Sequence, residues 1–393
     1  MSEELPSPGQ KVVIESGALQ EILDSIRERG FTTLGPVIRD GAIIYDDIES
    51  LEELPQGWTD EQNAGKYRLV KSDRESYFAY SLGPESWKKY LQAPLRQLWT
   101  ASRDGAGFQV EKQNMEMVRT AFIGVRPCDL NAISILDRIL SQGVYRDPSY
   151  AAVRAGIVTI AVNCGRAGGT CFCASMRSGP RASSGFDLAL TEIIDGERHY
   201  FLVDVGTQNG ASFLEKAPFR TAGNAEIEAA DDVSSRVVRE MGRHLDTGGI
   251  RDLFSRNFDN PRWELAAAPC LTCGNCTMVC PTCFCTTVED KTDLTGKLAE
   301  RRQRWDSCFT MDFSYIHGGS IRSSQKARYR QMVTHKLGSW IDQFGVSGCV
   351  GCGRCITWCP AGIDITETVR AMREGERTQM TTFSIKESEH GNA

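Results

Sequence analysis

The chain has 393 residues, of which 41% are hydrophobic and 24% charged, and its formal net charge is −6 at pH 7. This length favours two domains, and the composition is that of an ordinary globular protein, without the basic excess that a nucleic-acid or anionic-membrane partner requires. The unusual feature is the count of 15 cysteines, which are grouped along the chain rather than scattered.

The start of the chain bears on where these cysteines function. MSEELPSPGQ lacks the basic and apolar regions of a secretory signal peptide. The longest apolar run, residues 156–164, is about half of the roughly 18 residues that a membrane span needs. We therefore expect a cytoplasmic protein without a membrane span. Because thiols stay reduced in that compartment and the cysteine count is odd, metal ligation explains them better than disulfides.

Residues 11–250 mix strand-like apolar runs with amphipathic helical segments, which is typical of an α/β or α+β domain. Residues 120–125 predict a strand and residues 131–140 a helix, joined by a turn that contains proline. This turn carries Cys128, and Asp129 is placed to cap the helix. We expect the domain to cover residues 1–258.

A second strand is predicted in the same domain. The apolar run 157–162 ends at a glycine-rich loop that carries three cysteines. With Cys128, they make four thiols on loops that we expect to converge, and four thiolates suit a [4Fe-4S] cluster. This possible third cluster is assigned to Cys128, Cys164, Cys171 and Cys173. Buried or interfacial free thiols remain the alternative, because free cysteine is often buried.

The strongest signal is the motif C-x2-C-x2-C-x3-C-P, which begins at Cys270 and occurs again from Cys349. The three closely spaced thiolates can bind three corners of one iron–sulfur cubane, while the cysteine before proline ligates the other cluster. The first cluster is therefore assigned to Cys270, Cys273, Cys276 and Cys359. The second is assigned to Cys349, Cys352, Cys355 and Cys280.

Zinc is the alternative metal for these motifs. Zinc ribbons usually present two separated CxxC pairs, whereas each motif here has three evenly spaced cysteines followed by Cys-Pro. The long segment between the motifs includes a helical stretch, residues 322–344. We therefore expect an α-helical, ferredoxin-like domain with two clusters over residues 259–373, followed by a disordered tail over residues 374–393.

Three cysteines near the first motif lack a fourth partner, and packing or interface roles suit them better than another cluster. They are Cys283, Cys285 and Cys308. No GxGxxG or Walker-type loop precedes a helix, and the five histidines share no metal-ligand spacing. We therefore expect no catalytic residue and no cofactor beyond the clusters in this chain.

At these residues the chain resembles a known family, the iron–sulfur β subunit of cytosolic [NiFe] hydrogenases of the sulfhydrogenase type, which is related to the corresponding iron–sulfur component of anaerobic sulfite reductase. The resemblance covers most of the chain beyond about residue 65. It rests on Gly124-Val-Arg-Pro-Cys-Asp129, Asn163-Cys164, Thr170-Cys-Phe-Cys173, the two cluster motifs, and the run from Trp305-Asp-Ser-Cys308 to Gly319.

The resemblance implies a non-catalytic electron-transfer subunit. Electrons would pass through its clusters between the large and small subunits of a hydrogenase and a flavin subunit that handles NAD(P)H. The same motifs also fit the electron-input subunit of an anaerobic sulfite or sulfur reductase. Catalysis would take place in the partners, because the sequence lacks the paired CxxC motifs that hold a nickel–iron centre.

Overall fold

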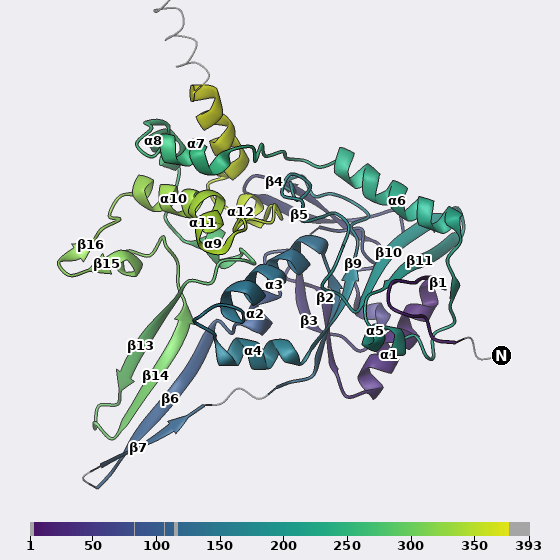
Figure 1. Ribbon diagram of the computed structural model, residues 1–393, viewed down its shortest axis with the longest axis horizontal. Helices are drawn as coiled ribbons and strands as arrows, with labels where there is room; N and C mark the ends of the chain where they lie inside the picture. The colour runs from purple at the N-terminus through teal and green to yellow at the C-terminus, as the bar shows by residue number, and fades with distance from the viewer. Residues whose placement is uncertain (1–3, 82, 106, 114–116, 377–393) are drawn as a thin grey trace, which may run out of the picture.

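A computed structural model describes residues 4–81, 83–105, 107–113 and 117–376 (Figure 1). Its largest element is a mixed eight-stranded sheet with the order β12-β1-β11-β10-β9-β8-β2-β3, in which the four strands β10, β9, β8 and β2 run parallel. The strands are β1 (Lys11–Glu15), β2 (Thr32–Arg39), β3 (Ala42–Asp47), β8 (Thr120–Val125), β9 (Ile157–Val162), β10 (Leu188–Asp195), β11 (Arg198–Val205) and β12 (Arg220–Thr221).

Helices cover both faces of this sheet, which is why its central strands are apolar on both sides. In β8, Ala121 and Ile123 pack into a core with the first helix, whereas Phe122 packs on the other side against the helices that connect β8 to β9. The covering helices are α1 (Leu19–Glu28), α3 (Pro127–Leu140), α4 (Pro148–Ala155), α5 (Gln208–Ser212) and α6 (Asn224–Arg239). The predicted α/β character of this part is confirmed.

A second sheet of four strands forms an arm that projects from the body (Figure 1, lower left). It joins two hairpins that are far apart in the sequence, and β14 pairs with β6 at its centre. The strands are β6 (Leu95–Asp104), β7 (Gly107–Lys112), β13 (Thr286–Thr292) and β14 (Leu298–Trp305). The expected division into domains at residue 258 stays a prediction, and this sheet takes strands from both sides of it.

Smaller elements complete the N-terminal part and the loops. They are the hairpin β4 (Trp58–Asn63) and β5 (Lys66–Lys71), the hairpin β15 (Tyr315–Ile316) and β16 (Gly319–Ser320), α2 (Lys88–Leu91), and the 3-10 helices η1 (Ser16–Ala18), η2 (Leu51–Glu53) and η3 (Asp312–Ser314).

The C-terminal part consists mainly of short helices and loops (Figure 1, upper left). The short helices are α7 (Ile250–Arg256), α8 (Arg262–Ala267), α9 (Asn275–Met278), α10 (Gln325–Thr334), the π-helix η4 (His335–Ser339), α11 (Trp340–Phe344) and α12 (Arg354–Thr357). The helical stretch predicted over residues 322–344 thus comprises α10, η4 and α11. A final helix over residues 365–376 includes the start of the expected tail, and the rest of that tail lies outside the described residues.

Within the described ranges, no helix combines the length and the apolar character needed to cross a membrane.

Candidate metal centre

The two cysteine motifs adopt the same local backbone conformation. The residue two positions after the first cysteine has a positive φ in both copies, at Thr272 (52°) and Gly351 (64°). Each turns its amide onto the preceding thiol: Thr272 N lies 3.4 Å from Cys270 Sγ, and Gly351 N lies 3.3 Å from Cys349 Sγ. Both loops therefore direct a backbone donor at a cysteine sulfur, as is usual around iron–sulfur clusters.

A left-handed glycine then ends each loop. Gly274 (φ 76°) and Gly353 (φ 77°) directly precede the short helices α9 and α12. A Cβ at Gly353 would lie 2.5 Å from Thr170 Oγ1, so glycine is needed there for space as well as for conformation. The helices that follow carry the third cysteine of each motif.

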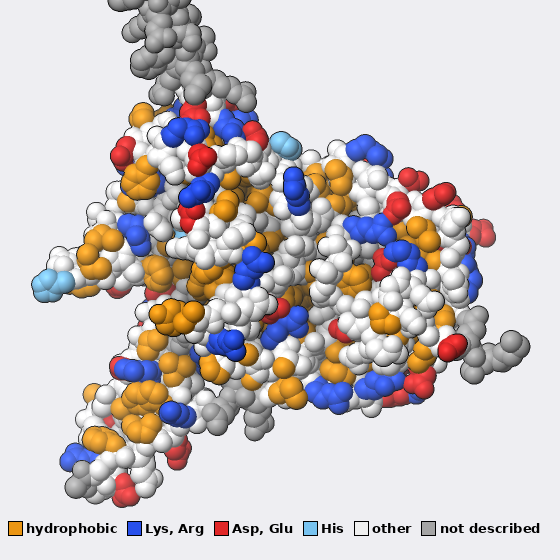
Figure 2. Space-filling model, viewed as in Figure 1, with side chains coloured by type: hydrophobic (Ala, Val, Ile, Leu, Met, Phe, Trp, Pro, Cys, Tyr) orange, Lys and Arg blue, Asp and Glu red, His pale blue; other side chains and the backbone are white. Residues whose placement is uncertain are grey.

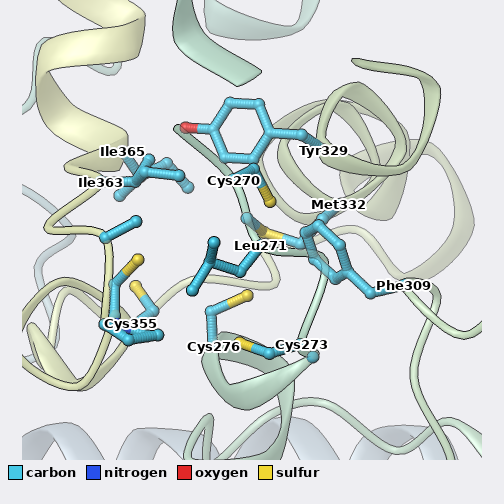
Figure 3. Close-up of a pocket in the computed structure, with 14 residues that line it drawn as sticks. Cys270, Leu271, Cys273, Cys276, Phe309, Tyr329, Met332, Cys355, Ile363 and Ile365 are labelled. Carbon is cyan, nitrogen blue, oxygen red and sulfur yellow. The ribbon is translucent and has the colours of Figure 1, made fainter. Parts of the chain in front are cut away.

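An apolar pocket collects the cysteines assigned to the first cluster. Its empty volume is about 490 Å³, and side chains from both motifs surround it (Figure 3). Around the sulfur atoms, Leu271, Phe309, Tyr329 and Met332 form most of the wall. The cysteines that line it are Cys270, Cys273, Cys276, Cys355 and Cys359.

The first pocket fits a cationic group bound by thiolates. Burial raises the pKa of Cys270, and it raises the pKa of Cys276 well above its usual range. An apolar pocket of this kind disfavours isolated thiolates, so the thiolates need a bound cation to balance them. In the described part of the chain, no group of three or more His, Cys, Asp or Glu side chains forms a site for a single metal ion.

The cysteines assigned to the second cluster also lie together. Cys280 is an electrostatic neighbour of Cys349, Cys352 and Cys355. Burial raises the pKa of Cys349 to about 12 and raises the pKa of Cys355 well above its usual range. Cys280 differs, because a hydrogen bond from Cys283, together with the charge of Lys336, lowers the pKa of its thiol. In both sets, the last cysteine of one motif thus lies with the first three cysteines of the other.

The four cysteines of the possible third cluster converge as well. Cys164, Cys171 and Cys173 follow β9, and each is an electrostatic neighbour of at least one other member of the set. Burial raises the pKa of Cys171 to about 12 and that of Cys128 well above its usual range. Cys352, assigned to the second cluster, is a neighbour of this set too.

The surroundings of Cys128 differ from the sequence expectation in two respects. Cys128 lies in the first turn of α3 rather than in the preceding loop, because Pro127 begins the helix. Asp129 does not cap that helix. Its carboxylate accepts two hydrogen bonds from Arg354, with Nη1–Oδ1 and Nη2–Oδ2 distances of 2.7 and 2.9 Å, because the buried guanidinium offers a charged, bidentate partner.

The loop of the possible third site is held directly against the second motif. Phe172 N donates to Gly351 O at 2.9 Å, and Ser178 Oγ donates to Val350 O at 2.5 Å. Cys171 Sγ lies 3.9 Å from Cys352 O. These contacts hold the loop that carries Cys171 and Cys173 against residues 350–352 of the second motif.

The three unassigned cysteines lie beyond Cys280. Cys283 hydrogen-bonds to Cys280, Cys285 is an electrostatic neighbour of Cys308, and Cys308 also neighbours Cys276. Sequence reasoning missed two buried cations near these thiols, Lys88 and Lys336, and a third, Arg354, beside Cys352. Only Arg354 carries a signal in the sequence, because it lies between Gly353 and Cys355 inside a cluster motif. Neither lysine stands in a recognisable pattern.

Comparison with known proteins identifies the class of the C-terminal part. The family model "4Fe-4S dicluster domain" matches residues 269–363. The chain is also similar to "Sulfhydrogenase 2 subunit beta" of Pyrococcus furiosus, with 29% identity over 371 residues, which cover 93% of this chain and 98% of that protein. The chain is therefore an iron–sulfur protein with a C-terminal 4Fe-4S dicluster domain, and its predicted resemblance to sulfhydrogenase β subunits is confirmed.

Proposed function

We propose that this chain is an electron-relay subunit that transfers electrons between a [NiFe] hydrogenase module and a flavin subunit that handles NAD(P)H. The observation that carries the proposal is the continuous series of cysteine groups: the set after β9 adjoins Cys352, and Cys355 of the same motif lines the pocket of the first set. A relay needs such a series, because electrons pass between centres that lie close together. The similarity to a sulfhydrogenase subunit supports the choice of partners.

The ligand assignment is part of the proposal. Three [4Fe-4S] clusters, when bound, would each supply a one-electron carrier, and the C-terminal pair would lie in an α-helical, ferredoxin-like domain over residues 259–373. The first is held by Cys270, Cys273, Cys276 and Cys359; the second by Cys349, Cys352, Cys355 and Cys280; the third by Cys128, Cys164, Cys171 and Cys173.

The chain's own residues would hold the clusters and shield them from water. Apolar side chains such as Phe309 and Met332 line the first pocket, and the amides of Thr272 and Gly351 donate to cysteine sulfurs. Exposure differs along the series: Cys273 is exposed, whereas Cys128 and Cys173 are buried. The first cluster is therefore placed to exchange electrons with a neighbouring subunit.

The first experiment is anaerobic purification of the chain from its native host, with iron and sulfide analysis and identification of the proteins that co-purify. About twelve irons per chain, four for each cubane, with nickel-containing large and small subunits and a flavin subunit, would support the proposal. About eight irons would leave only the C-terminal pair of clusters. A co-purifying sirohaem subunit would show that the chain belongs to a sulfite reductase and not to a hydrogenase. Zinc without iron would reject the proposed electron relay.

Substitution of one assigned ligand tests the cluster arrangement. Cys276→Ala should lose or convert the first cluster, with a loss of up to about four irons per chain, because a cubane needs a ligand at each iron. Electron transfer should stop while the eight-stranded sheet remains folded. Iron analysis and low-temperature EPR check this prediction. Cys285→Ala, in the same segment but outside the assigned sets, is the matched control and should keep its iron. An unchanged iron content in Cys276→Ala would reject the assignment.

A further inference from the structure

Two buried lysines stand beside the second set of cysteines. Lys88 and Lys336 are only 3% and 4% exposed. The ammonium of Lys88 donates to the backbone oxygen of Cys283 at 2.9 Å and lies 3.9 Å from the ring centre of Trp305. Lys336 instead reaches the sulfur of Cys280, a ligand in the assignment above. A buried cation is costly unless anionic or polar groups compensate it, so both lysines point to negative charge at this place.

The geometry of Lys336 is that of a fully satisfied ammonium. Its Nζ lies 3.2 Å from Cys280 Sγ, 3.1 Å from Thr282 Oγ1 and 3.2 Å from Gly348 O. These three acceptors match the three N–H bonds of a charged lysine. The single proton of the Thr282 hydroxyl goes to Gly348 O at 2.6 Å, which leaves the lone pairs of Thr282 Oγ1 free to accept from the lysine.

The backbone fixes this side chain in position. Lys336 belongs to the π-helix η4, and its carbonyl accepts a hydrogen bond of 2.8 Å from Gly348 N, directly before Cys349. Its ammonium also lies 5.3 Å from the ring centre of Trp340. Lys336 is thus bound at both ends to the segment that leads into the second motif. Single π turns within helices often occur at functional sites.

Among the described residues, no cation donates to a sulfur in the pocket of the first set. The buried Arg328 is an electrostatic neighbour of Cys270, but its guanidinium donates to backbone oxygens, among them Phe309 O at 2.8 Å. The residues that line the pocket are cysteine, glycine, proline, tyrosine and apolar side chains, with no lysine or arginine among them (Figure 3). The two sets of cysteines therefore differ in whether a buried cation donates a hydrogen bond to one of their sulfurs.

We propose that Lys336 is a positioning residue that raises the reduction potential of the second cluster above that of the first. Reduction adds an electron to a centre that already carries the charge of four thiolates. A buried ammonium that donates to one of these sulfurs stabilises the reduced state more than the oxidised state. This inference rests on the proposed function, because it requires Cys280 to ligate a cluster. Its consequence is that electrons favour the second cluster over the first.

The test is a redox titration of the full chain, followed by EPR, on Lys336→Met and on Lys326→Met. Lys326 is on α10, just before η4, and forms a surface ion pair with Glu264, so its removal takes the same charge from an exposed position. Lys336→Met should make the second midpoint more negative by about 59 mV or more, which corresponds to a tenfold change in a one-electron equilibrium. The first midpoint, and both midpoints of Lys326→Met, should not move.

An unchanged second midpoint in Lys336→Met with a full iron content would overturn the inference. Cys349→Ala identifies the EPR signal of the second cluster; if that variant keeps every signal, the ligand assignment fails and not the role of the lysine. If the Lys336→Met protein cannot be purified with a full iron content, the inference is tested on the unmutated chain. With lysine labelled by a heavy nitrogen isotope, pulsed EPR of the reduced second cluster should detect that nitrogen, and the absence of this coupling would equally overturn the inference.

Discussion

The ion pair between Arg354 and Asp129 connects the two cysteine-bearing parts of the chain. Its side chains are 0% and 1% exposed, and the guanidinium also donates to Gly83 O at 3.3 Å. Asp129 directly follows Cys128, and Arg354 directly precedes Cys355. The pair therefore fixes the possible third site relative to the second cluster motif. In the proposed relay, it would keep the distance between the second and third clusters constant.

We predict that Asp129→Ala destabilises the chain by roughly 3–5 kcal/mol, because it leaves a buried guanidinium without its counter-charge. Denaturant unfolding followed by circular dichroism measures the change. Asp259→Ala is the matched control: Asp259 pairs with Arg330 but its side chain is 91% exposed, so its loss should cost about 0–1 kcal/mol. Equal effects of the two substitutions would show that the buried pair contributes no more than a surface one.

At this scale the spacing of the cysteines predicts which of them share a cluster, whereas the two buried lysines beside them carry no signal in the sequence. The motif spacing alone groups the first three cysteines of each motif, because they lie on one short loop and the helix that directly follows it. The sequence predicts that Asp129 caps α3, because it stands close to the start of that helix. Its carboxylate instead binds the guanidinium of Arg354, which lies more than 200 residues away in the sequence. Lys336 is similar, because nothing in its local sequence reveals the sulfur that it reaches.

Two loops pack closely at the centre of the site. The loop 170–173 lies tightly against the second cluster motif. A Cβ atom at Gly351 would lie 2.6 Å from Phe172 O, and a Cβ atom at Gly353 would lie 2.5 Å from Thr170 Oγ1. Both glycines also have a positive φ. Side chains at these positions would clash and strain the backbone, so the two loops depend on glycine for their close approach.

We predict that Gly353→Ala lowers stability by about 1–3 kcal/mol for the strained φ alone, and that the clash with Thr170 separates the loop 170–173 from the second motif. The iron content should fall, because ligands on both loops are displaced. Gly165→Ala serves as the comparison, since Gly165 has open space around it and no positive φ. Thermal unfolding and iron analysis check both variants, and a Gly353→Ala protein with full iron and unchanged stability would contradict the prediction.

The elements that the sequence predicted are those with a clear local signal. The strands β8 and β9 are continuous apolar runs, and α10 to α11 follow a helical pattern, so each could be recognised without its partners. The arm could not. Every residue of β7 is exposed, so the strand has no apolar face, and β6 finds its partner β14 only across about half of the chain. Such pairing is invisible to a local pattern.

Two of the cores in the described part of the molecule should depend on metal to different degrees. The core under the eight-stranded sheet draws its buried side chains from Val12 to Ala217 and contains no cysteine. The core of the C-terminal part includes Cys270, and Cys276, Cys349 and Cys355 pack against it. In Figure 2 this part lies at the upper left, continuous with the body and separated from the arm by a notch. Clusters bound there would hold that core together, while the sheet would be stable through apolar burial alone.

We therefore predict that removal of iron by a chelator under anaerobic conditions unfolds the C-terminal part and leaves the sheet intact, because metal binding in such small domains supplies much of the folding free energy. Amide hydrogen exchange on the full chain measures this. Segments from α10 to α12 should lose protection, whereas β8, β9 and β10 should keep it. The control is the same treatment with iron-saturated chelator, which should change neither part. Simultaneous loss of protection in both parts would mean that the two cores form one cooperative unit, joined through the Arg354–Asp129 pair and the shared arm.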